Sequence, residues 1–356
     1  IRSVTGVRDP PEGSLISFLH APGFSGLRLR SQNVRRTVNF MSASHEKPRS
    51  VEVSSTLSSL ESSDLSGYQS DQERRLTVTG KVLRIVIAVA MMFACALTPS
   101  LLSQIPAVRS FGIAHSHPQS NVDDVVMAAL VLLLYGTATI LVLMLCYVLR
   151  RTLDRGRRVS LNLRLDRRAL LWAVGMVLVA VAVNLAVAGI VHALGLAGGN
   201  EGMPNRPWWF IAAAIFSQAF FLQGIPEEII WRGWLFSSLG ETRFAAVSSV
   251  LGFTVLHLLS QGGQQNLFEH LTYLALPCGF AVTALIVRMI SGSTWAAIGV
   301  HGGIHVANDV LSDRLHLPSG SITWVLQGLL WAAVGLLILA FHRRRQRLAA
   351  LTDRTC

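Results

Sequence analysis

The chain changes character near residue 82, from a polar stretch to long apolar runs separated by short polar segments. The runs extend over about 82–103, 125–149, 170–194, 208–242, 244–260, 271–290, 294–311 and 321–341. Most contain about 20 residues, the length that an α-helix needs to cross a bilayer. The pattern therefore predicts an all-α fold, a polytopic membrane helix bundle of about eight transmembrane helices.

Composition supports a membrane protein and changes the interpretation of its charge. Of the 356 residues, 51% are hydrophobic and 14% are charged, which is too apolar for an ordinary soluble domain. The net charge of +11 reflects arginines between the runs, at 150–168, Arg243, Arg288 and 343–347. If the runs alternate across the bilayer, all of these lie on one side, which the positive-inside rule makes cytoplasmic. We expect a multi-pass protein of the plasma (inner) membrane with both termini cytoplasmic, and no nucleic-acid partner.

The pattern divides the chain into three regions. Residues 1–80 are polar and have no apolar period, which predicts a disordered N-terminal tail. Residues 81–342 form the expected transmembrane helical domain, and residues 343–356 form a basic C-terminal tail. Met41 is a candidate start, in which case the first forty residues lie outside the working protein.

The fourth run contains charged residues where a membrane helix normally has none. Glu227, Glu228 and Arg232 lie within it, although each charge at the bilayer centre costs about 2.5–3.5 kcal/mol. Glu228 and Arg232 are four residues apart, so we expect them to pair on one helix face. Glu227 lies about 100° around the helix, where we expect it to lack that partner and to face a cavity. Pro226 removes the donor to the carbonyl of Leu222, which we expect to open the helix for a water molecule.

Histidines within two later runs are the other candidates for chemistry. His257 lies in the fifth run, four residues after Phe253. His301, His305 and Asp309 lie in the seventh run and are spaced by four residues. This spacing predicts one stripe on a helix face. His301 and His305 could bind one metal ion, and Asp309 could orient the imidazole of His305.

Each feature alone also has a plain structural explanation. A lone membrane histidine such as His257 often makes an interhelical hydrogen bond, and Gly299 and Gly303 suit close helix packing. Glu228 and Arg232 could form a structural ion pair. A glutamate and three histidines on three separate runs, taken together, indicate a buried site that handles water or metal.

Three motifs occur in a fixed order along this part of the chain. They are Glu-Glu-x-x-x-Arg at 227–232, Phe-x-x-x-His at 253–257, and Ser-Gly-Ser-Thr-Trp at 291–295 before the helix with His301. In this order the motifs resemble the CAAX protease and bacteriocin-processing (CPBP, or Abi) family of intramembrane proteases. The resemblance places a protease-like core at about 208–311.

The resemblance implies a peptide hydrolase with its site inside the bilayer. It implies that Glu227 activates water, that His257 assists, and that His301 helps to hold the oxyanion. A desolvated glutamate can act as a general base near neutral pH, and oxyanion donors are most effective where water is scarce. The implied catalytic set is Glu227, Glu228, Arg232, His257, His301 and His305.

The chain departs from the family at His305, where the family usually has Asn or Asp. An imidazole can replace the amide as an oxyanion donor. The departure also favours a metal, because Glu227, His257, His301 and His305 make a His₃Glu set that suits Zn²⁺. A glutamate-only and a zinc-assisted mechanism both remain open.

The resemblance suggests a substrate, and the residues leave other functions open. The expected partners are the lipid bilayer and a membrane-associated peptide or protein, with a prenylated C-terminal box suggested by the family name. One alternative is a non-catalytic membrane scaffold or immunity factor, in which the polar residues hold helices together. Another is an ion or proton carrier, in which Glu227 and the histidines form a relay.

Overall fold

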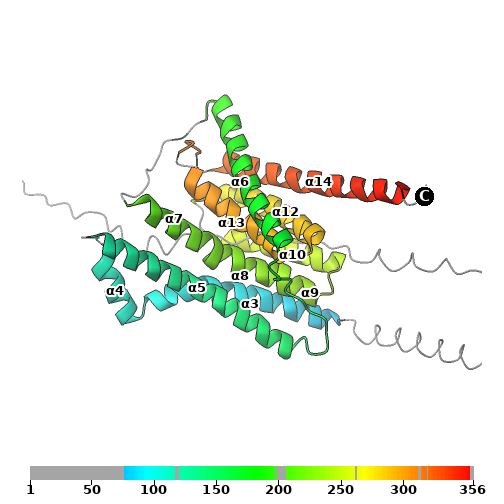
Figure 1. Ribbon diagram of the computed structural model, residues 1–356, viewed down its shortest axis with the longest axis horizontal. Helices are drawn as coiled ribbons and strands as arrows, with labels where there is room; N and C mark the ends of the chain where they lie inside the picture. The colour runs from blue at the N-terminus through cyan, green and yellow to red at the C-terminus, as the bar shows by residue number, and fades with distance from the viewer. Residues whose placement is uncertain are drawn as a thin grey trace, which may run out of the picture.

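The computed structural model describes residues 76–116, 120–196, 198, 206–260, 263–311, 314–318 and 320–352. Over these residues the protein is all-helical, without strands, so the predicted fold class is confirmed (Figure 1). The predicted disordered tail lies almost wholly outside the described residues.

The helices occupy every apolar run that the sequence predicts. Here η1 and η2 are π-helices and η3 is a 3₁₀-helix. In chain order they are α3 (Val78–Ser103), α4 (Pro106–Ser116), α5 (Asn121–Arg151), α6 (Arg167–Ala193), α7 (Trp208–Phe216), η1 (Ser217–Gly224), α8 (Ile225–Glu228), η2 (Ile229–Leu235), α9 (Phe236–Ser238), α10 (Arg243–Leu256), η3 (His257–Leu259), α11 (Leu267–Tyr273), α12 (Ala275–Ser291), α13 (Thr294–Leu311) and α14 (Ser321–Thr352).

Among the described residues, six helical segments are long and apolar enough to cross a membrane, against the predicted eight or so. They are 78–103, 121–151, 167–193, 208–238, 267–291 and 321–352. The difference lies in α10, which has 14 residues, and α13, whose 18 residues include histidines and glycines. The chain is therefore an integral multi-pass membrane protein in which α10 and α13 lie among the longer helices.

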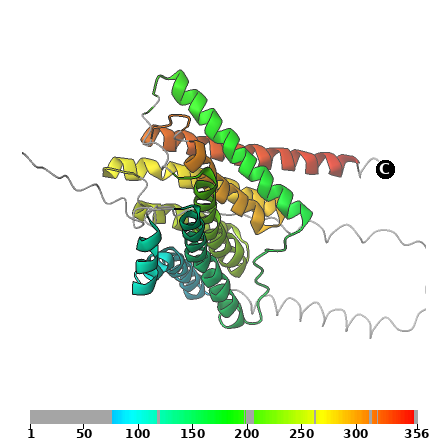
Figure 2. The same cartoon turned by 60° about the vertical axis from the view of Figure 1, so that its left-hand side comes forward.

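The arginine-rich segments gather at one end of the bundle. Figures 1 and 2 show α3 and α6 beginning, and α5 and α14 ending, toward the same end. The segment 150–168, which joins α5 to α6, and Arg243, the first residue of α10, lie there as well. The helix α14 continues through the basic residues to Thr352, so the predicted C-terminal tail begins as part of this helix. That this end faces the cytoplasm stays a prediction.

Close helix packing places α13 in the interior. A Cβ added at Gly303 would lie 2.9 Å from the Cα of Val177, and one at Gly299 would clash with the carbonyl of Ala173. Both glycines therefore allow α13 to approach the backbone of α6, as the small-xxx-small spacing predicts. His301 lies on the opposite side of α13 from these glycines, next to Glu228 and Phe280, and is fully buried there.

Candidate functional site

The Glu-Glu motif lies where one long helix departs from α winding twice. The segment 208–238 passes from α7 into the π-helix η1, back to α in α8, and again to π in η2. The N–H of Ile225 donates to the carbonyl of Phe220, the i to i−5 pattern of a π-helix. π-Helices are rare and occur often at functional sites. Two of them flank Glu227 and Glu228.

Pro226 opens the helix at a different carbonyl from the one predicted. With π winding before the proline, its missing N–H would have bonded Phe221 rather than Leu222. The hydroxyl of Thr139, on α5, donates to the carbonyl of Phe221 at 2.7 Å. The predicted position was wrong because it assumed α winding, and a side chain of a neighbouring helix takes the place expected for water.

Glu228 joins two helices through a fully buried ionic network. Its Oε2 lies 3.0 Å from Nε of Arg232, so the predicted pair is confirmed. Its Oε1 lies 3.0 Å from Nδ1 of His301 on α13. All three side chains are 0% exposed. A carboxylate only accepts hydrogen bonds, so Nδ1 of His301 carries the proton.

Glycines bring α13 close enough for this contact. A Cβ at Gly224 would lie 3.1 Å from the backbone nitrogen of Gly302, and one at Gly302 would clash with the ring of Phe220. The two helices therefore meet backbone to backbone one turn before the Glu pair. This approach lets the side chain of Glu228 reach the helix that carries His301.

The imidazole of His257 is held through Nδ1 by a backbone carbonyl. Its Nδ1 lies 3.0 Å from the carbonyl of Phe253. A carbonyl only accepts, so Nδ1 carries the proton and Nε2 of the neutral ring keeps a lone pair. The imidazole lies between the rings of Phe253 and Tyr273, with centroids 4.7 and 6.0 Å away. It is fully buried and interacts electrostatically with His301 and His305.

Glu227 is buried near Arg232 and near two residues that no motif singled out. Its side chain interacts electrostatically with Arg232, as well as with Cys95 of α3 and Tyr273 of α11. The expectation that it lacks Arg232 as a partner was therefore wrong, because the wider π winding that follows departs from the assumed α geometry. Cys95 and Tyr273 resemble ordinary core and interfacial residues in the sequence, so spacing alone could not have found them.

His301 and His305 lie side by side, whereas Asp309 faces another helix. The two imidazole centroids are 5.2 Å apart, and within the described chain both Nε2 atoms are buried without a hydrogen-bond partner. Asp309 is exposed and interacts electrostatically with Tyr135 of α5. The structure thus gives His305 its predicted neighbour His301, and places Asp309 beside Tyr135 rather than in a contact with His305.

The predicted zinc ligands do not form a metal-binding set in this arrangement. Over the residues described, no group of three or more His, Cys, Asp or Glu side chains could hold one metal ion. Nδ1 of His301 is occupied by Glu228, which leaves only its Nε2 for a ligand. The Zn²⁺ ion therefore stays a prediction that this geometry does not support.

The comparisons with known proteins concern the same part of the chain. Residues 204–307 match the family described as Type II CAAX prenyl endopeptidase Rce1-like. No curated protein and no solved structure matches the chain. The matched segment contains both glutamates and all three histidines of the site. It confirms the family resemblance expected from the motifs and supports a membrane-embedded protease at the level of class.

Proposed function

We propose that this chain is a glutamate-dependent intramembrane endopeptidase. The premise is the match of residues 204–307 to the Rce1-like type II CAAX prenyl endopeptidase family. Its substrate is a membrane-associated peptide or protein, with a prenylated C-terminal box as the form the family favours. The observation that carries the proposal is the division between the two glutamates. Glu228 is committed to Arg232 and His301, whereas Glu227 lies beside Tyr273 and Arg232.

Glu227 and His257 are the pair suited to activating water. The lone pair on Nε2 of His257 accepts one hydrogen of the water, and the carboxylate of Glu227 removes the other as a proton. The water oxygen bonds to the scissile carbonyl carbon, and the carbonyl oxygen becomes an oxyanion. When the C–N bond breaks, the proton on Glu227 passes to the leaving amine. General acid–base catalysis of this kind contributes about 10²–10⁴-fold to the rate.

His301 and His305 are suited to holding the oxyanion. His301 can donate from Nε2 only when its ring carries both protons, because Nδ1–H is already donated to Glu228. His305 can donate from Nε2–H as a neutral ring, in the position where the family usually has Asn. Donors fixed in a dry site stabilise the oxyanion more strongly than donors in water.

The experiment compares two carboxylate-to-amide variants of the purified full chain. A farnesylated peptide with a C-terminal box serves as the substrate, and cleavage is followed by mass spectrometry. We expect Glu227→Gln to lower kcat at least 100-fold with an unchanged unfolding temperature, and Glu269→Gln to behave as the wild type. Glu269 is the matched control because it lies on α11 and accepts a hydrogen bond from the backbone of Gln265. Full activity of Glu227→Gln would sink the proposal.

A non-catalytic scaffold is the second candidate, because complete burial of Glu228, Arg232 and His301 also suits a purely structural network. In that case the wild type cleaves no peptide, and Glu227→Gln weakens folding or partner binding. The inner-membrane location with both termini cytoplasmic, and a zinc ion, are further predictions. Metal analysis of the purified protein tests the zinc.

A further inference from the structure

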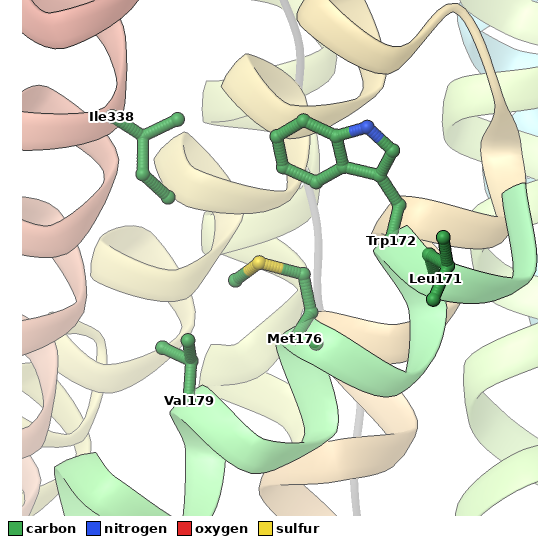
Figure 3. A pocket seen from close by; sticks show the side chains of 6 residues that line it. Leu171, Trp172, Met176, Val179 and Ile338 are labelled. Carbon is green, nitrogen blue, oxygen red and sulfur yellow. The ribbon is translucent and has the colours of Figure 1, made fainter. Parts of the chain in front are cut away.

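An apolar groove lies between α6 and α14, on the outside of the bundle. Its volume is about 320 Å³, near the lower end for ligand sites. Leu171 is 62% exposed, so the groove opens to the surroundings of the helices. Figure 3 shows the α6 side chains facing that of α14 across the groove. Its lining residues are Leu171, Trp172, Gly175, Met176, Val179 and Ile338.

Basic residues lie beyond the same end of the groove on both helices. The start of α6 and the end of α14 point toward the same end of the bundle (Figure 1). Arg167 precedes Leu171 by four residues, and His342 follows Ile338 by four, so each shares a helix face with a groove residue. Arg345 lies about one turn beyond His342. Arg167 and Arg345 are exposed, and His342 is half-buried. The guanidinium of Arg345 lies over the ring of Phe341, 4.7 Å from its centroid, and keeps its charge and its N–H groups for a phosphate.

Two neighbouring charged side chains at the start of α6 have partners of their own. Arg168 donates to the carbonyl of Ile290 at 3.2 Å, which turns it toward α12. Asp166 caps α6, where its Oδ1 accepts from the backbone N–H of Ala169 at 2.8 Å. The local field at the end of the groove is therefore positive, and its nearest carboxylate is engaged with the helix.

We propose that this groove binds one anionic phospholipid. Its acyl chain lies along the apolar residues between α6 and α14, and its phosphate lies between Arg167 and Arg345. Basic residues beside a groove between membrane helices are suited to anionic headgroups, and long arginine side chains can extend to the headgroup level while their stems stay in the apolar layer. The half-buried indole of Trp172 suits the boundary between chain and headgroup.

Gly175 lines the groove, and a substitution there tests directly whether the groove binds lipid. A Cβ at Gly175 would meet no atom within 4 Å, so a side chain added there begins in open space, and Gly175→Leu places its branched end in the groove. Gly189 lies on the same helix, outside the groove, and likewise has no atom within 4 Å of an added Cβ. Gly189→Leu therefore makes the same chemical change to α6 without filling the groove.

The measurement is native mass spectrometry of the full chain in detergent, with phosphatidylglycerol and phosphatidylcholine of identical acyl chains. We expect the wild type and Gly189→Leu to prefer phosphatidylglycerol, and Gly175→Leu to bind both lipids at least fivefold more weakly. Arg167→Gln and Arg345→Gln should each weaken the binding of phosphatidylglycerol about fivefold, because each basic residue contributes about 1 kcal/mol. The binding of phosphatidylcholine should not change.

A second measurement keeps the test independent of variant folding. Since a ligand of the folded state stabilises it, phosphatidylglycerol should raise the unfolding temperature of the wild type and Gly189→Leu but not of Gly175→Leu. Equal binding of the two lipids by the wild type, or undiminished phosphatidylglycerol binding by Gly175→Leu, would overturn the proposal. So would displacement of phosphatidylglycerol by a farnesylated peptide, which would make the groove a site for the substrate's lipid tail.

Discussion

The helix α5 and the helical segment 208–238 both contain 31 residues and are both apolar enough to span a membrane. The two segments differ in their winding and in the side chains that they bury. The helix α5 is α-helical throughout, and its buried residues are mostly apolar. The segment 208–238 contains two π-helical stretches and buries Glu227, Glu228 and Arg232.

The two segments also differ in the groups that stabilise them. The helix α5 satisfies its backbone hydrogen bonds within the helix and packs mostly through apolar side chains. The segment 208–238 depends on particular side chains of other helices, namely Thr139 for a free carbonyl and His301 for a carboxylate. Local departures from regular structure that need such support are typical of functional sites.

The largest expected effect comes from removing the centre of the ionic network. Glu228→Ala leaves Arg232 and His301 buried without their shared carboxylate, so we expect a loss of about 3–5 kcal/mol in the free energy of unfolding. Gly136→Ala on α5 is the control, because an added Cβ there meets nothing within 4 Å. Reversible unfolding in mixed micelles measures both. A loss below 1 kcal/mol for Glu228→Ala would mean that the network contributes little to folding.

Thr139→Val tests the support of the π-helix and should have a smaller effect. The substitution keeps the shape of the side chain and removes the hydroxyl that donates to the carbonyl of Phe221. We expect a loss of about 1–2 kcal/mol in the free energy of unfolding, since a buried carbonyl loses its partner. Thr137→Val is the control, because the hydroxyl of Thr137 bonds within its own helix, to Leu134. Equal losses for the two variants would show that Phe221 needs no such partner.

Regular features of this fold could be predicted from the sequence, and irregular ones could not. Apolar runs of sufficient length located the helices, and a spacing of four predicted the pair of Glu228 with Arg232. The winding of η1 and η2 has no signal of that kind, because it depends on contacts such as Gly224 with Gly302. The errors at Leu222 and Glu227 both came from assuming an α-helix.

The contact between Glu228 and His301 is a second feature that the sequence could not predict. The residues are 73 positions apart, and the motifs gave each a role without joining them. Only the packing of α13 against η1 brings them together. Tyr273 was missed for the same reason, since its neighbours His257 and Trp324 lie on two other elements.

Tyr273 gives the smallest expected effect and the finest test of the proposed site. Its ring stacks on that of His257, and its hydroxyl bonds to Ser260, whose own hydroxyl donates to the carbonyl of His257 at 2.8 Å. Tyr273→Phe keeps the ring and removes one hydrogen bond, worth about 0.5–1.5 kcal/mol. If Tyr273 positions His257 for water activation, kcat should fall about two- to tenfold while KM and the unfolding temperature stay constant. Tyr147→Phe, on the exposed face of α5, is the control. An unchanged kcat, or a fall in stability that matches the fall in rate, would reduce Tyr273 to a packing residue of α11.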